Sequence, residues 1–245
     1  MPPADDPAGA GVPVAKHGNR AVSSRAGSAD VLAALGVDVD APKDRVERCI
    51  AEIGIGFLFA PRLHPAFKAV AGIRRELAVR TVFNLLGPLA NPAGARHQIM
   101  GVYEPRWVPI IAGVLRTLGA AHAFVVHGEG LDEIAVTGMT HVCEVKGGEV
   151  ERFAMVPEDI GLARHPEREI AGGDASENAR ILRDVLAGQR GAPRDAVLAN
   201  AAAGLVCAGA ARDLRDGVRL AAESIDRGAA AERLARLIAI TRAAA

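Results

Sequence analysis

A polar segment near the start of the sequence, VAKHGNRAVSSRAGSADVL at residues 14–32, combines glycines with many hydrogen-bond donors. Lysine supplies a point charge, serine hydroxyls rotate to suit an acceptor, and glycine lets backbone N–H groups approach a ligand closely. A glycine-broken turn of this kind, followed by a helix that Ser28 caps, suits an anion with many oxygen atoms, such as phosphate. A solvated basic turn has the same composition, so the segment alone leaves both interpretations open. The donors are Lys16, His17, Asn19, Arg20, Ser23, Ser24, Arg25 and Ser28.

A second polar cluster follows an apolar run in VVHGEGLDEIAV, where Asp132 and Glu133 are adjacent in a glycine-flanked loop. Loops after the strands of open α/β sheets commonly carry ligands. Magnesium takes one or two carboxylates together with phosphate oxygens. Seen beside an oxyanion segment, the pair predicts a magnesium–phosphate site, whereas alone it would also fit a solvated acidic turn.

Arg74 and Arg75 fall on a predicted helix whose apolar stripe includes Val70. One guanidinium can reach toward a cleft and hold a substrate carboxylate while the other points to solvent. A solvated helix face would show the same pattern. His17 and His64 are candidates for hydrogen-bond donors, acid–base groups or structural residues.

A covalent nucleophile has little support, because the sequence holds no G-x-S-x-G motif and no cysteine in an activating motif. We therefore expect no catalytic nucleophile. Transfer from an activated phosphorylated sugar needs none, because the leaving group can depart through an oxocarbenium-like state. That chemistry depends on a metal, on donors around a diphosphate and on positioning of the acceptor.

Composition narrows the class of protein. The 245 residues carry no net formal charge, which argues against a general nucleic-acid or membrane-surface binder and makes any anion site local. Cys49, Cys143 and Cys207 lie far apart, as expected of buried thiols in a reducing compartment. With neither a secretory signal nor a membrane-length apolar run in the sequence, we expect a cytoplasmic protein.

Helices and strands are expected to alternate in the middle of the chain. Apolar periodicity predicts three early helices, and FNLLGPLANP then breaks the chain at Gly87-Pro88 and at Asn91-Pro92. HQIMGVY and AFVVHG read as strands joined by a helix, which predicts a parallel β-α-β unit. HVCEVKGGEVERFAM predicts a hairpin, and the chain beyond Gly172 reads as helical. The early helices begin at Ser28, Pro42 and His64.

Three motifs in this order, KHGNRAVSSRAGSADVLAALGV, RTVFNLLGPLANP and GEGLDEIAVTG, resemble the anthranilate phosphoribosyltransferase family from about Gly9 to the C-terminus. The resemblance implies that anthranilate displaces pyrophosphate from phosphoribosyl pyrophosphate, giving N-(5-phosphoribosyl)anthranilate in tryptophan biosynthesis. It implies an α/β fold with a mainly parallel central sheet flanked by helices, and part of a small helical domain whose N-terminal helices are missing. It further implies two magnesium ions, a homodimer, and no nucleic-acid or membrane partner.

The resemblance also assigns roles to individual residues. Asp132 and Glu133 match the magnesium-binding pair, and Arg74 matches the arginine that receives the anthranilate carboxylate. His17, His64 and Pro88 match residues along the acceptor's path, and Asn19 contacts both substrates. The phosphoribosyl pyrophosphate site comprises Lys16, His17, Gly18, Asn19, Arg20, Ala21, Val22, Ser23, Ser24 and Ser28.

The sequence lacks the several N-terminal helices and the glycine-rich GTGGD loop with which members of this family begin. We expect residues 1–13 to be a leader or the end of an upstream helix, and residues 14–245 to be the phosphoribosyltransferase α/β domain. Residues 64–92 would contribute to the small helical domain. Two alternatives stay open: a relative of the pyrimidine nucleoside phosphorylases, which would use phosphate and a nucleoside, and a non-catalytic remnant that binds a ligand without turnover.

Overall fold

The computed structural model describes residues 10–21, 25–64 and 83–243. Within these ranges, six strands form two hydrogen-bonded sheets. The first sheet pairs β1 (Val14–Gly18) in parallel with β2 (Ile55–Phe59). The second has the order β3-β4-β5-β6, with β3 and β4 parallel and the remaining neighbours antiparallel. Its strands are β3 (His97–Gly101), β4 (His122–Gly128), β5 (Thr140–Lys146) and β6 (Glu149–Met155).

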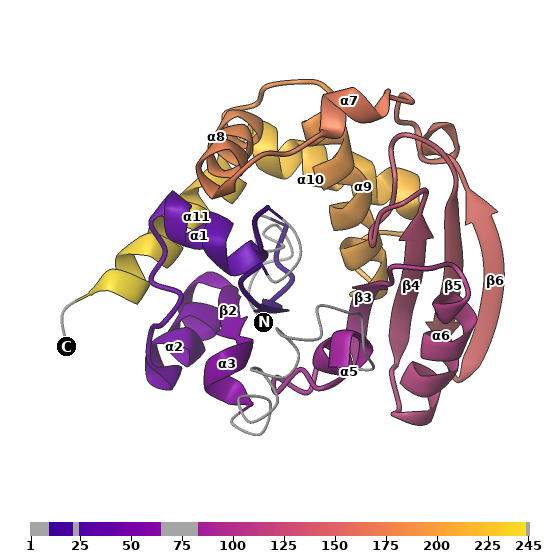
Figure 1. The fold of residues 1–245 in the computed structure, drawn as a ribbon, viewed down its shortest axis with the longest axis horizontal. Coiled ribbons are helices and arrows are strands. Elements are labelled where there is room, and N and C mark those ends of the chain that lie inside the picture. Colours follow the sequence, from indigo (N-terminus) through magenta and orange to yellow (C-terminus); the bar gives the residue numbers. More distant parts are fainter. Residues whose placement is uncertain (1–9, 22–24, 65–82, 244–245) are drawn as a thin grey trace.

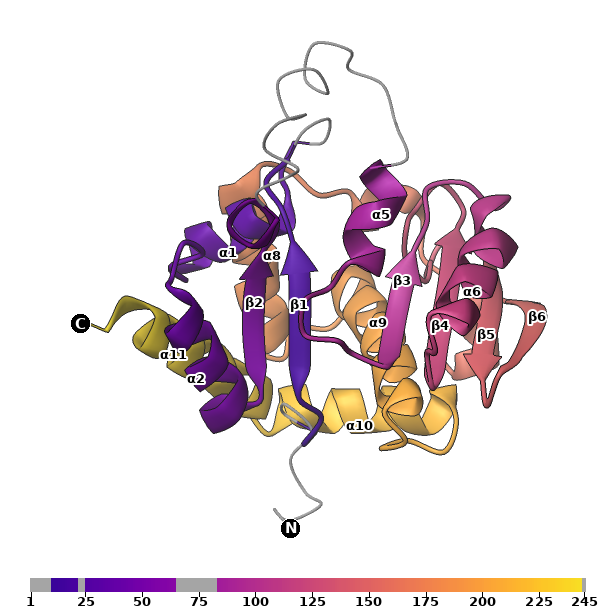
Figure 2. The same ribbon diagram turned by 90° about the horizontal axis from the view of Figure 1, so that it is seen from below.

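Helices cover both faces of the four-stranded sheet. On one face lies α6 (Trp107–Thr117), and on the other lies α9 (Ala192–Cys207) with α10 (Leu214–Asp226) behind it (Figures 1 and 2). The remaining helices are α1 (Ser28–Leu35), α2 (Lys43–Ile53), α3 (Ala60–Leu63), α5 (Phe83–Leu89), the 3-10 helix η1 (Pro157–Ile160), α7 (Glu167–Ile170), α8 (Ala175–Leu186) and α11 (Ala229–Arg242).

Three apolar clusters hold these layers together. The first lies between the four-stranded sheet and α9 and α10, the second lies between the same sheet and α6, and the third joins α1, α2, β2 and α11. Strand β4 is buried along its whole length because both of its faces are covered. The α/β expectation with flanking helices is confirmed. The expectation of a mainly parallel central sheet holds only for β3 and β4 in the four-stranded sheet, because β5 and β6 form a hairpin with a short turn and join β4 in antiparallel pairing.

The two sheets lie beside each other, with β1 and β3 as facing edges (Figures 1 and 2). The side-chain amide of Asn91 links them by donating to the carbonyl oxygen of Ala15 on β1, 3.1 Å away. Strands β1, β2 and β3 run in the same direction (Figure 2), and β4 is parallel to β3. The carboxyl ends of four strands therefore meet at one edge of the molecule.

Strand β1 corrects the expectation that residues 14–32 begin as a turn. Val14–Gly18 forms a strand because its backbone pairs with that of β2. No strand is predicted from the sequence at β2, which is a short apolar run. The N-terminal cap of α1 is also different: Gly27, and not Ser28, is the N-cap residue. The carboxylate of Asp30 accepts a hydrogen bond from the Gly27 N–H, which stabilises this end of the helix.

The expected break at Gly87-Pro88 is also wrong, because α5 continues through Pro88 to Leu89. A proline this close to the end of a helix costs few backbone hydrogen bonds, and burial of Leu85 against the second apolar cluster favours the helix. The strands at HQIMGVY and AFVVHG, their parallel pairing, the hairpin at Gly147-Gly148 and the C-terminal helices are confirmed. The helix expected from His64 lies largely outside the described residues.

Among the described residues, the structure contains no helix with the length and apolar character needed to cross a membrane. The three cysteines are buried and free of disulfides, as expected.

Candidate active site

The predicted site residues follow the carboxyl ends of the parallel strands. Lys16, His17 and Gly18 occupy the end of β1, and Asp132 and Glu133 follow β4. His64 follows α3, which begins directly after β2. This edge of a parallel sheet is where α/β folds bind ligands, because the loops there converge. The chain thus brings its basic and acidic motifs, more than a hundred residues apart, to the same edge.

On β1, the imidazole of His17 is half-buried and meets His64, with the two Nε2 atoms 3.1 Å apart and the rings edge to face. One nitrogen of such a pair donates the proton and the other accepts it. Burial, and then the His64 ring, lower the pKa of His17, whereas a hydrogen bond with the Gly87 backbone raises it. The pair is therefore favoured in a form that carries no charge on His17.

The loop after β1 is fixed by Asp30 on α1. Its carboxylate accepts hydrogen bonds from the N–H groups of Ala21 (2.9 Å) and Gly27 (3.0 Å), and it pairs with Arg20 at 3.2 Å. These bonds lower the pKa of Asp30, the Ala21 contact being the largest cause. The guanidinium of Arg20 also lies over the Phe59 ring. Arg20 is thus engaged in holding the loop.

Gly18 and Gly27 permit a close approach of chain segments in this loop. A Cβ atom on Gly27 would lie 2.4 Å from the Ala21 nitrogen, and one on Gly18 would lie 2.4 Å from the hydroxyl oxygen of Ser28. Ser28 is half-buried at the first turn of α1 and points toward the end of β1. Asn19 accepts a hydrogen bond from the Ala29 N–H through its main-chain carbonyl oxygen. The side chains of Asn19 and Arg20 are exposed.

The acidic loop after β4 is compact. The N–H of Gly128 donates to the carbonyl oxygens of Leu131 (3.1 Å) and Glu133 (3.0 Å), and the Leu131 N–H donates back to Gly128 (3.1 Å). The Asp132 backbone rests on Gly101 at the end of β3, where a Cβ atom would lie 1.5 Å from the Asp132 carbonyl oxygen. A Cβ atom on Gly128, at the end of β4, would lie 2.7 Å from the Glu133 carbonyl oxygen, so the loop depends on glycine at the end of each of the two neighbouring strands.

Both carboxylates of the loop reach solvent, but the pKa of Glu133 is raised. The first cause is displacement of water by surrounding protein, and the second is the negative charge of Asp132. The positive charge of Lys16 acts in the opposite direction and lowers the pKa of Glu133. A cation at the pair would relieve the repulsion between the two carboxylates.

The donor set fits magnesium with its substrate. The described residues contain no group of three or more His, Cys, Asp or Glu side chains arranged to hold a metal alone. Asp132 and Glu133 supply the one or two carboxylates that magnesium typically takes from a protein when phosphate oxygens and water complete its shell.

Helix α5, which contains the predicted residue Pro88, and the turn after it contact strand β1. Gly87 contacts His17 through its backbone, and the Asn91 side chain binds Ala15. Pro88 lies between them in the chain. Val22, Ser23, Ser24 and Arg74 lie outside the described residues, so their assigned roles stay predictions.

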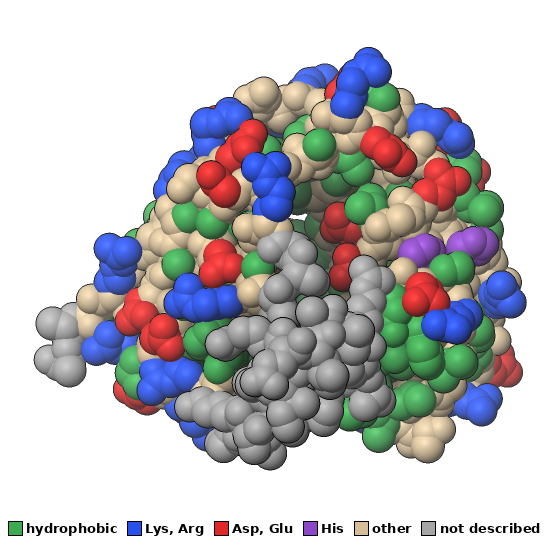
Figure 3. Space-filling model, in the orientation of Figure 1, with side chains coloured by type: hydrophobic (Ala, Val, Ile, Leu, Met, Phe, Trp, Pro, Cys, Tyr) green, Lys and Arg blue, Asp and Glu red, His purple; other side chains and the backbone are tan. Residues whose placement is uncertain are grey.

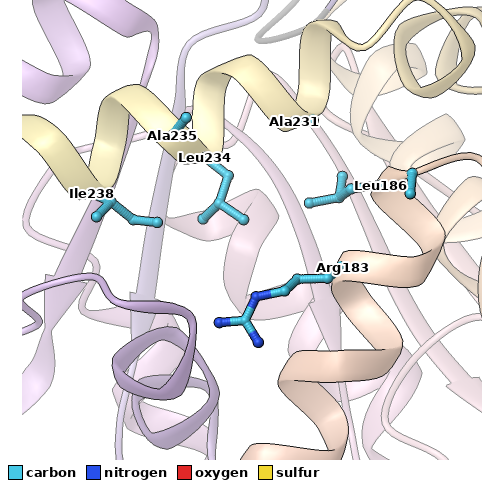
Figure 4. A pocket seen from close by; sticks show the side chains of 7 residues that line it. Arg183, Leu186, Ala231, Leu234, Ala235 and Ile238 are labelled. Atoms are coloured by element: carbon cyan, nitrogen blue, oxygen red, sulfur yellow. The ribbon is translucent and has the colours of Figure 1, made fainter.

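The surface is hollowed at its centre, where Asp or Glu side chains line one side of the hollow (Figure 3). Two other depressions have no predicted site residue in their lining. One, of about 320 Å³, is lined by Glu144, Lys146, Glu149 and Glu151 on the β5–β6 hairpin. The other is an apolar groove of about 250 Å³ between α8 and α11, with Arg183, Leu186, Leu234 and Ile238 in its wall (Figure 4).

Two residues that shape the site were not singled out from the sequence. Asp30 follows Gly27 by three positions, which is the spacing of a helix-capping carboxylate and could have identified it. Gly101 lies within a predicted strand, but its need for glycine arises from the Asp132 backbone, 31 residues further along the chain. No local pattern reports such a contact.

Comparisons with known proteins agree with this geometry. Residues 7–231 match the model of the glycosyl transferase family, a/b domain. The chain is 82% identical over 238 residues to the anthranilate phosphoribosyltransferase of Anaeromyxobacter sp. (strain Fw109-5), covering 97% of this chain and 71% of that protein.

Solved structures give the same result. The crystal structure of anthranilate phosphoribosyltransferase from Thermus thermophilus matches with a TM-score of 0.90 and 51% identity, covering 96% of this chain and 70% of that one. The Saccharomyces cerevisiae enzyme, solved with PRPP and Mg, matches with a TM-score of 0.86 and 31% identity, over 96% of this chain and 66% of that one. The chain therefore belongs to the anthranilate phosphoribosyltransferase family.

Proposed function

We propose that this chain transfers the phosphoribosyl group of phosphoribosyl pyrophosphate to anthranilate, in tryptophan biosynthesis. The bond between ribose C1 and the diphosphate oxygen breaks, a bond between C1 and the anthranilate nitrogen forms, and the nitrogen loses a proton. The products are N-(5-phosphoribosyl)anthranilate and pyrophosphate. The observation that carries this proposal is the convergence of the Lys16–Gly18 strand end and the Asp132–Glu133 loop at the carboxyl ends of strands that run in the same direction (Figure 2).

In this proposal the two ends of the site have different tasks. Lys16, Ser28 and the backbone of residues 18–21 hold the phosphates, which suits a loop whose glycines permit close approach. Asp132 and Glu133 hold magnesium, which when bound neutralises negative charge on the departing diphosphate. The yeast relative solved with PRPP and Mg supports this use of the metal, and two ions are our proposal for this chain.

The His17–His64 pair and Asn19 are proposed to lie along the path of the acceptor, with Pro88 near them. The lowered pKa of His17 favours an uncharged imidazole on the acceptor's path. The positive charge that the phosphates require then comes from other residues, such as Lys16. Arg74 is proposed to bind the anthranilate carboxylate through its guanidinium fork.

A comparison of acceptors tests the proposal. The purified chain is incubated with phosphoribosyl pyrophosphate, Mg²⁺ and anthranilate, and separately with phosphate and uridine or thymidine, and the products are identified by mass spectrometry. We expect phosphoribosylanthranilate in the first reaction only. Phosphorolysis of the nucleoside would favour the phosphorylase alternative, and binding of phosphoribosyl pyrophosphate without a product would favour a non-catalytic role.

Three further proposals concern the chain as a whole. The buried free cysteines support a cytoplasmic, reducing setting. A homodimer and the assignment of residues 64–92 to a small helical domain stay predictions. Light scattering during size-exclusion chromatography tests the dimer.

A further inference from the structure

Asn200 on α9 binds the backbone directly after the acidic pair. Its Oδ1 accepts a hydrogen bond from the Ile134 N–H (3.0 Å), and its Nδ2 donates to the Ile134 carbonyl oxygen (3.1 Å). The same Nδ2 group donates to the Ala196 carbonyl oxygen on its own helix (3.0 Å). The three bonds fix the orientation of the amide, because a flipped amide would place its oxygen against two carbonyl oxygens.

The contact bears on Glu133 because the Glu133–Ile134 peptide is held from both sides. Its carbonyl oxygen accepts from the Gly128 N–H (3.0 Å), and its N–H donates to Asn200. A peptide unit is planar, so two bonds on opposite edges fix its rotation and with it the direction in which the Glu133 side chain leaves the backbone. Ile134 itself is buried in the cluster beneath α9, which anchors the unit to the core.

We propose that Asn200 is the positioning residue of the Asp132–Glu133 pair and tunes its affinity for divalent cations. This inference rests on the proposed metal role of the pair. Asn200 lies in the alanine-rich sequence AVLANAAAGLV of α9, and a half-buried amide among these apolar side chains is costly unless its hydrogen bonds are made. Its partners are the backbone groups of one loop residue and one turn of its own helix.

The chain offers a matched control. Asn178 on α8 is also half-buried and binds one residue at two points, accepting from the Gly173 N–H (2.8 Å) and donating to the Gly173 carbonyl oxygen (3.2 Å). Asn178→Ala removes the same kind of clamp from a different loop. Asn200→Ala and Asn200→Leu remove the clamp beside Glu133, and leucine keeps a branched side chain with the same number of heavy atoms where alanine would leave a cavity.

Mn²⁺ serves as the probe, and its binding to the whole chain is followed by paramagnetic broadening of the Asp132 and Glu133 amide signals. We expect the dissociation constant for Mn²⁺ to rise about tenfold in both Asn200 variants, the lower end of the effect of supporting residues on metal sites. Asn178→Ala should leave it unchanged. Hydrogen exchange at the Ile134 amide should accelerate in the Asn200 variants only.

Wild-type affinity in a folded Asn200 variant would overturn the inference while leaving the proposed function in place. An equal loss in Asn178→Ala would also overturn it, because the effect would then be general destabilisation. If Mn²⁺ fails to broaden Asp132 and Glu133 in the unchanged chain, the metal role of the pair fails together with the inference.

Discussion

Gly101→Ala, a substitution at the end of β3, is expected to displace the loop that carries Asp132 and Glu133. Gly101 ends β3 in an extended conformation that alanine can adopt, so the added methyl group is the main perturbation. That group would lie 1.5 Å from the Asp132 carbonyl oxygen and 2.3 Å from its carbon. Ordinary contact begins near 3.4 Å, so the backbone of the loop must move by about 2 Å.

A displacement of this size is large on the scale of catalysis, where about 1 Å of misplacement costs about 100-fold in rate. We therefore expect kcat/KM for anthranilate transfer to fall by at least about 100-fold, or about 2.7 kcal/mol of transition-state stabilisation. Overpacking should lower the free energy of unfolding by about 1–3 kcal/mol, which leaves the chain folded. Mn²⁺ broadening at Asp132 should weaken in parallel.

Steady-state rates, Mn²⁺ titration and thermal unfolding measure the three effects. Gly113→Ala on α6 is the matched control, because apart from its chain neighbours and the backbone of its own helix no atom lies within 4 Å of the added Cβ, and a helical alanine is favoured over glycine by up to about 1 kcal/mol. Full activity and wild-type Mn²⁺ affinity in a folded Gly101→Ala chain would refute the argument that strand β3 sets the position of the acidic loop.

Three further predictions concern individual side chains. The pKa of His17 lies below that of an unfolded histidine, so its contribution to stability is complete above about pH 6.5 and is lost as pH falls through the folded value. In an NMR titration, His64→Gln should raise this pKa only in part, because burial is the larger cause; no rise would contradict the pairing. Arg194 is buried, and its guanidinium lies 2.7 and 2.9 Å from the carboxylate oxygens of the half-exposed Asp226. Arg194→Ala should lower the free energy of unfolding, measured by chemical denaturation, by about 2 kcal/mol. A decrease below about 0.5 kcal/mol would contradict a stabilising role for this ion pair. Burial raises the pKa of Cys207 to about 12, so this thiol should resist Ellman's reagent at pH 8 until the chain unfolds, and rapid labelling of the native chain would contradict its burial.

The elements that can be predicted from the sequence are those with local patterns. Periodicity identifies α2, the strands β3 and β4, and the hairpin of β5 and β6. Strand β1 was missed because its polar side chains resemble a turn, and only pairing with β2 makes it a strand. Its partner is a short apolar run whose periodicity does not distinguish strand from helix.

The candidate site follows the same division. Lysine, glycine and paired carboxylates suggested phosphate and magnesium from their chemistry, and the parallel strands bring these groups to one edge. Gly101 and Asn200 act through contacts with distant backbone, so their importance emerges only in three dimensions, whereas the spacing of Asp30 from Gly27 is a local signal. The acceptor assignments depended on resemblance, because an arginine or histidine on a helix has many uses.

The most direct test is the fluorescence of anthranilate after addition of the purified chain, phosphoribosyl pyrophosphate and Mg²⁺. The account predicts a Mg²⁺-dependent loss of fluorescence with the unchanged chain, and none with a folded chain carrying both Asp132→Asn and Glu133→Gln. Unaltered Mg²⁺-dependent turnover by the double variant, or no turnover by the folded unchanged chain, would contradict it.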